Sequence, residues 1–119
     1  MSLNRTCAPL RNNDVNETGD ADYAGRGILV GVTVTNSSSA VAYVRIYDKA
    51  TGATSSDTPK YGELAIAATS TQIFGAPQGL FPIDNGLSAR ATTDSGDSAN
   101  TGVGANEVTV HYHYQELHG

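Results

Sequence analysis

Two histidines, His111 and His113, lie two residues apart near the end of the sequence. Residues i and i+2 of an extended strand point to the same side, so the two imidazoles can approach one ion. A catalytic zinc ion normally takes three protein ligands, and the sequence offers only His118 or Glu107 as the third. A metal site therefore competes with a solvated polar face and with a subunit contact. The missing third ligand favours the last two, and we expect no metal or cofactor.

Two acidic stretches are also rich enough in oxygen ligands to hold calcium in principle. They contain Asp94, Asp97 and Asn100 in one loop, and Asp14, Glu17, Asp20 and Asp22 near the start of the chain. Neither has the spacing of an EF-hand loop, which favours solvated loop acids. The sequence has no GxSxG elbow, and Cys7 has no histidine near it. We therefore expect that the protein is not an enzyme.

An alternating row of Tyr43, Arg45 and Tyr47 is the third group that could act in recognition. Tyrosine and arginine are enriched at the centres of protein interfaces. One interpretation is an outward contact surface formed by this row. The other is that a sheet of the protein buries the row and Arg45 reaches solvent along its apolar stem. We name the three residues as a candidate interface.

The elements that carry these residues are predicted to be β-strands. The segment 27–48 contains two alternating stretches around an Asn-Ser turn, which predicts a β-hairpin. In its first strand one face is expected to hold Ile28, Val30, Val32 and Val34, and the other Leu29, Gly31, Thr33 and Thr35. In its second strand Ala42, Val44 and Ile46 share a face.

Further short strands are expected over 63–68, 71–74, 80–83, 86–93 and 106–114, with polar turns between them. The strand 86–93 is expected to turn Leu87, Ala89 and Ala91 inward, and Ser88, Arg90 and Thr92 outward. The last strand sets Val108, Val110, Tyr112 and Tyr114 against Glu107, Thr109, His111 and His113. No segment has helical periodicity, so we predict an all-β protein with a single antiparallel β-sandwich or jelly roll.

Residues 1–26 have almost no periodicity and predict an extended N-terminal arm, which a partly disordered terminus would also explain. The sandwich domain is then 27–116, followed by a short tail at 117–119. The sizeable apolar residues of the arm are candidate contacts with its own sheet or with another subunit. They are Leu3, Leu10, Val15 and Tyr23.

Composition limits the partners of this 119-residue chain. Seven Lys and Arg against twelve Asp and Glu give a net charge of −5, which makes nucleic acid an improbable partner. No long apolar stretch suggests a membrane span, and the polar start lacks the apolar centre of a signal peptide. The chain has no Trp and two Phe, so its core is built from small side chains. We expect association, as a homo-oligomer, to supply part of its stability.

The runs GVTVTNSSSAVAYVRIYDKATG, DTPK and FPIDNGLSARATTD resemble small structural proteins of tailed bacteriophages. The resemblance covers roughly residues 27–94 and contains no catalytic signature. It implies a virion component made in the host cytoplasm, with the major capsid protein or other virion subunits as partners. Within that class the expected role is a capsid decoration protein that gives capsid stabilisation. The alternatives are a head-to-tail or fibre-associated module, and a carbohydrate-binding adsorption module.

Overall fold

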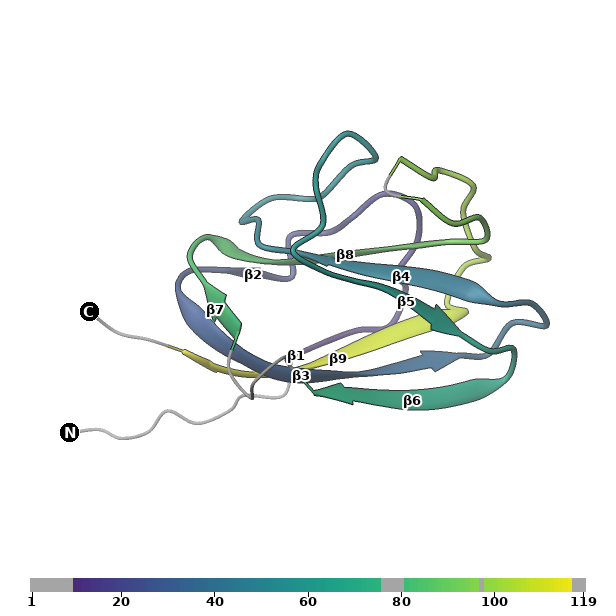
Figure 1. The fold of residues 1–119 in the computed structure, drawn as a ribbon, viewed down its shortest axis with the longest axis horizontal. Coiled ribbons are helices and arrows are strands. Elements are labelled where there is room, and N and C mark those ends of the chain that lie inside the picture. The colour runs from purple at the N-terminus through teal and green to yellow at the C-terminus, as the bar shows by residue number, and fades with distance from the viewer. Residues whose placement is uncertain (1–9, 76–80, 97, 117–119) are drawn as a thin grey trace.

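The computed structural model describes residues 10–75, 81–96 and 98–116, and these residues form nine β-strands in two antiparallel sheets (Figure 1). The first sheet has the order β1-β9-β3-β6, and β7 also pairs with β3. The second sheet has the order β2-β8-β4-β5. The strands are β1 (Leu10–Asn12), β2 (Tyr23–Ala24), β3 (Gly27–Asn36), β4 (Ala42–Tyr47), β5 (Tyr61–Ile66), β6 (Ser70–Gly75), β7 (Phe81–Ile83), β8 (Gly86–Thr92) and β9 (Val108–Glu116).

The two sheets pack face to face around small apolar side chains, which confirms the prediction of an all-β protein with sandwich-like layers. Four of the predicted alternating faces lie buried between the sheets, because strand alternation places every second side chain there, and the face of Leu87, Ala89 and Ala91 is inward as predicted. These faces are Val32 and Val34 of β3; Ala42, Val44 and Ile46 of β4; Leu87, Ala89 and Ala91 of β8; and Val108, Val110, Tyr112 and Tyr114 of β9. The described residues contain no helix long and apolar enough to cross a membrane.

The predicted hairpin over 27–48 is wrong, although both of its strands form. β3 pairs with β6, β7 and β9, whereas β4 pairs with β5 and β8, so the turn between them crosses from one sheet to the other. The fully buried Asn36 holds this crossing. Its amide Nδ2 donates to the carbonyls of Ala40 at 2.8 Å and Ile66 at 3.1 Å. The apolar faces of β3 and β4 thus meet across the core and not within one sheet.

A β-bulge also changes the predicted faces of β3. Leu29 pairs with Tyr114 and Gly31 with His113 in the adjacent β9, which leaves Val30 as an extra residue. Leu29 is fully buried and Val30 is 46% exposed, so the expectation that Val30 lies on the core face is wrong. One inserted residue reverses the alternation, and this is why the pattern holds from Val32 onward but fails before it.

The outer face of the second sheet is covered by three loops, which are 13–22, 48–60 and the described residues 93–96 and 98–107; Figure 1 shows them beside β8 and β4. Ser88 Oγ accepts a hydrogen bond from the Ala53 backbone N–H at 3.0 Å, and the Arg90 side chain donates to Glu17 O at 2.6 Å. Ser88, Arg90 and Thr92 point away from the core as predicted. They do not reach solvent, however, because the loops leave all three with no accessible area.

Residues 10–26 contribute a strand to each sheet. β1 pairs with β9 and β2 with β8. Between them Val15 is 1% exposed and belongs to the core, and its N–H donates to Val108 O at 3.0 Å. This part of the chain is therefore fastened to its own sandwich, whereas residues 1–9 of the predicted arm lie outside the described residues.

Candidate functional site

The outer face of the first sheet is open over the middle of its strands, and it forms the candidate site. Alternation turns one set of side chains from four adjacent strands away from the core. We call this set the open face. It consists of Arg11 from β1, Thr109, His111 and His113 from β9, Thr33 and Thr35 from β3, and Thr71 and Ile73 from β6.

Backbone pairing places the open-face residues in rows across the sheet. One row runs Arg11, His111, Thr33, Ile73, and each residue is the direct cross-strand partner of the next. Cross-strand neighbours on one face have Cβ atoms about 5 Å apart, so their side chains touch. Ile73 is 77% exposed at the β6 end of this row. The row therefore passes from a cation at one edge strand to an uncovered apolar side chain at the other.

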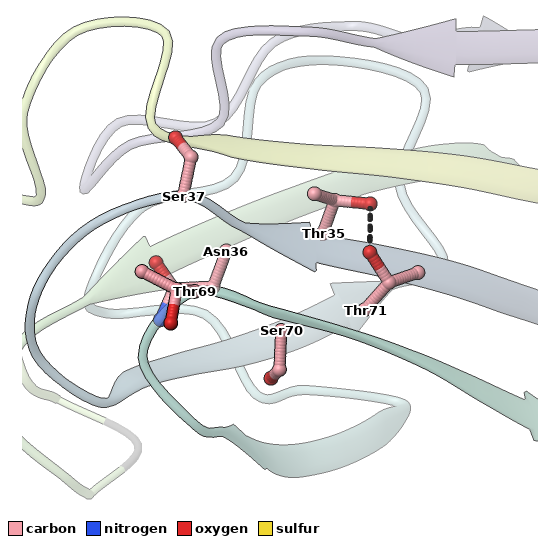
Figure 2. Close-up of a pocket in the computed structure, with 6 residues that line it drawn as sticks. All are labelled: Thr35, Asn36, Ser37, Thr69, Ser70 and Thr71. Atoms are coloured by element: carbon pink, nitrogen blue, oxygen red, sulfur yellow. Dashed lines mark hydrogen bonds between the residues drawn. The ribbon is translucent and has the colours of Figure 1, made fainter.

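A second row, of threonines, borders a hollow of about 290 Å³. Figure 2 shows the hydroxyls of Thr35 and Thr71 facing each other across β3 and β6, and their Oγ1 atoms are 3.0 Å apart. The hollow is lined by Thr35, Asn36, Ser37, Thr69, Ser70 and Thr71. Its lining is rich in hydroxyls and contains no charged group, so it can form hydrogen bonds but offers no residue for acid or base catalysis.

A second hollow of about 310 Å³ shares Thr35 with the first. Its lining comes from β1, β3, β9 and the residue that follows β1: Arg11, Asn13, Thr33, Thr35, Thr109 and His111. The two hollows thus meet at one threonine on the central strand β3. Because threonine is branched at Cβ and has few rotamers, these walls are stiff compared with walls of lysine or glutamate.

The two histidines lie side by side on the open face, as their spacing predicts. Their ring centroids are 4.8 Å apart, and His113 Nε2 is 2.8 Å from Thr33 Oγ1. The pKa of His111 is lowered, first by burial and then by the neighbouring His113 and Arg11. Each of these effects disfavours added positive charge at His111.

The third metal ligand considered for this pair is not supplied by Glu107, whose Oε1 accepts a hydrogen bond from the Gly104 N–H at 2.9 Å. His118 lies outside the described residues. Across residues 10–75, 81–96 and 98–116, no group of three or more His, Cys, Asp and Glu side chains is placed to hold a metal ion.

The candidate row of Tyr43, Arg45 and Tyr47 lies on the outer face of the second sheet, beneath its loops. Arg45 has no exposed area, Tyr47 is 1% exposed, and Tyr43 is half-buried. Arg45 Nη2 lies 2.6 Å from Glu63 Oε2, and Nη1 donates to Thr92 Oγ1 at 2.9 Å. Of the three, only Tyr43 has surface with which to touch a partner. Arg45 and Tyr47 can influence a contact only by holding the loops that cover them.

The apolar candidates from the start of the chain contact the chain's own sheets where the structure describes them. Leu10 and Tyr23 pack against the core, and the Tyr23 ring lies 4.7 Å from that of Tyr114. Val15 is part of the core itself. Leu3 lies outside the described residues. The sequence analysis selected these residues because they are apolar. Their burial in the chain's own sandwich accounts for that apolar character.

Sequence reasoning missed the open face as a site, even though it placed Thr33 and Thr35 on one side of β3. The available signal was the repeated threonine at i and i+2 in VTVT. Recognising the face also required knowing that β6 and β9 flank β3, which pattern alone does not give. Comparison of the chain with family models, with curated proteins and with solved structures finds no match.

Proposed function

We propose that this chain is a non-enzymatic structural protein of a bacteriophage virion, in the role of a head decoration protein that binds and stabilises the capsid shell. The sequence resemblance supports the setting. The observation that carries the proposal in the molecule is the open face, a stiff sheet surface with an apolar side chain, Ile73, left 77% exposed. A partner that covers this face would remove the Ile73 side chain from water, which contributes favourably to binding.

The physical mechanism is mass action. A protein that binds the assembled shell, and does not bind its separated subunits, stabilises the shell by its binding free energy at each occupied position. A preformed β-sheet surface suits this role, because little conformational entropy is lost when it docks. Threonine side chains, which have few rotamers, keep that loss small. A jelly-roll topology, an extended arm ahead of residue 27 and assembly as a homo-oligomer stay predictions of this proposal.

The test uses purified phage heads that lack the protein. We expect the wild-type chain to co-sediment with these heads and to raise the temperature at which they release DNA. Ile73→Lys replaces the exposed apolar group and should weaken binding about tenfold, since burying such a side chain is worth about 1.5–3 kcal/mol. Val41→Lys is the matched control, because Val41 is 41% exposed just before β4, in the other sheet.

The results separate the alternatives. Binding that Ile73→Lys weakens and Val41→Lys leaves unchanged supports the decoration role and assigns it to the open face. Binding to necks, tails or fibres without binding to heads would instead favour the head-to-tail or fibre-associated module. Binding to a glycan panel without binding to any virion part would overturn the proposal in favour of an adsorption module.

A further inference from the structure

The second hollow differs in charge from the molecule that carries it. The chain has twelve Asp and Glu against seven Lys and Arg. The hollow is lined instead by Arg11, His111, three threonines and Asn13, with no carboxylate among its lining residues. Arg11 and His111 are direct cross-strand partners. A hollow whose lining contains one permanent cation, Arg11, and no carboxylate complements a negatively charged group.

The groups around the hollow support the same conclusion. On β9 the neighbouring titratable group is His113, and the outward residues of β3 and β6 are the uncharged Thr33, Thr35, Thr71 and Ile73. Two carboxylates follow or precede the lining in sequence, Asp14 after Asn13 and Glu107 before Thr109. Neither lines the hollow, and each accepts a hydrogen bond from a backbone N–H, of Asn106 and of Gly104 respectively. The ion pairs among the described residues join Arg45 to Glu63 and Lys49 to Asp57. Arg11 takes part in neither and is exposed at the sheet edge.

We propose that this hollow binds a carboxylate from an Asp- or Glu-rich segment of a partner protein. Arg11 supplies the charge, and the Thr109 hydroxyl supplies a further hydrogen-bond donor. The hydroxyls of Thr33 and Thr35 are paired with His113 Nε2 and Thr71 Oγ1, and each donates to the carboxylate when it is the acceptor of that pair. A metal cation is disfavoured because Arg11 lies beside His111. Nucleic acid is disfavoured because a phosphate backbone is bound by several basic side chains, whereas the lining of this hollow contains one arginine. The inference rests on the proposed function only in taking the partner to be another virion protein.

The hollow also gains charge in mild acid. The lowered pKa of His111 means that its imidazole is neutral at pH 7.5 and takes up a proton only as the pH falls below its ordinary value of 6.5. Protonation places a second positive charge beside Arg11. Glutamate side chains, with a pKa of about 4.3, stay mostly ionised at pH 5. Binding of an acidic segment is therefore tighter once the pH is low enough to protonate His111 than it is at pH 7.5.

The experiment is an NMR titration of the ¹⁵N-labelled full chain, at low ionic strength, with acetyl-pentaglutamate amide. Saturable amide shifts are expected at Arg11, Thr33, Thr109 and His111. Arg11→Gln should raise the dissociation constant about fivefold, as loss of one exposed charge pair would. Arg26→Gln is the matched control, since Arg26 is exposed outside the hollow. His111→Gln should reduce the difference between pH 5 and pH 7.5.

Three outcomes would overturn the inference: no saturable shifts, equal binding of acetyl-pentaglutamine amide, or equal weakening by Arg26→Gln and Arg11→Gln. Sodium phosphate at matched ionic strength is the remaining arm. If phosphate binds as tightly as the peptide at the same amides, the hollow is a site for free anions and the inference fails. Heads that still bind the wild-type chain in that case would leave the proposed function standing. Peptide binding without head binding would support the anion-binding hollow and contradict the proposed decoration function.

Discussion

The outer faces of the two sheets arise from the same strand alternation, but one is covered by loops and the other is exposed. On the second sheet the outward residues Arg45 and Arg90 have no exposed area, because three loops lie over them. On the first sheet Ile73, also outward, is 77% exposed. Alternation thus determines which side chains leave the core, and the loops determine which of these reach solvent. A binding surface is left only where no loop covers the sheet.

The largest effect that tests this contrast is expected at Arg90. Its guanidinium donates to Glu17 O at 2.6 Å, to Tyr47 Oη at 3.1 Å and to Ala99 O, so it ties two loops to β8. Arg90→Ala removes the donor from these three acceptors, of which Tyr47 Oη and Ala99 O are buried, and opens a cavity. We expect a loss of about 3 kcal/mol in the free energy of unfolding, measured by urea denaturation.

The control for this variant is Arg26→Ala, which removes the same charge from an exposed position and should change stability by less than about 0.5 kcal/mol. Equal small losses for both variants would mean that the loops do not depend on Arg90. The covered face would then be no more fixed than the open one, and the comparison between the two faces would fail.

An intermediate effect is expected at Asp22, which joins the two sheets near their β1 and β2 edges. Its N–H donates to Leu87 O at 3.1 Å, and its carboxylate accepts a 2.6 Å hydrogen bond from Tyr112 Oη. Burial is the largest influence and raises the pKa of Asp22 above 3.8, despite the hydrogen bonds from Tyr112 and Asn12. The native state therefore disfavours the ionised carboxylate.

The sign of the pH dependence follows from that raised pKa. As the pH rises above 3.8, the unfolded state loses this proton first, so ionisation costs the native state stability. Asp22→Asn should be more stable than the wild type at pH 7, by less than about 1 kcal/mol because the site is partly solvated. The advantage should shrink toward pH 4, as followed by thermal melts. An advantage that does not change with pH would contradict the assignment to Asp22.

The fold was predictable from sequence where the alternation is local and unbroken. Ala42, Val44 and Ile46 were placed correctly on one shared face from period two alone, and that face is the buried one. The hairpin failed because an Asn-Ser turn satisfies its own backbone equally well within a sheet or between sheets. The deciding contact, from Asn36 to Ile66 O, joins residues 30 positions apart. Such a long-range contact cannot be predicted from the local alternation of apolar and polar residues.

The candidate site was less predictable than the fold for a related physical reason. The row of Tyr43, Arg45 and Tyr47 has the composition of an interface. The same side chains also suit a covered sheet face, because Glu63 and a loop carbonyl accept hydrogen bonds from the buried Arg45. The open face depends instead on which strands flank β3. Those neighbours are set by pairing between strands that are far apart in the sequence. His111 and His113 were placed together correctly because they lie on one strand.

The smallest effect should come from Ile73→Lys, the variant expected to impair partner binding. Ile73 lies on the edge strand β6 and is 77% exposed, so a lysine there displaces little packing. We expect the free energy of unfolding to change by less than about 0.5 kcal/mol, again by urea denaturation, with Val41→Lys as the matched variant. A loss of about 2 kcal/mol at dilute, monomeric concentration would show that the first sheet needs Ile73 for its own stability. A loss that appears only at high concentration would show that copies of the chain cover this face for one another, which would make the open face a subunit contact.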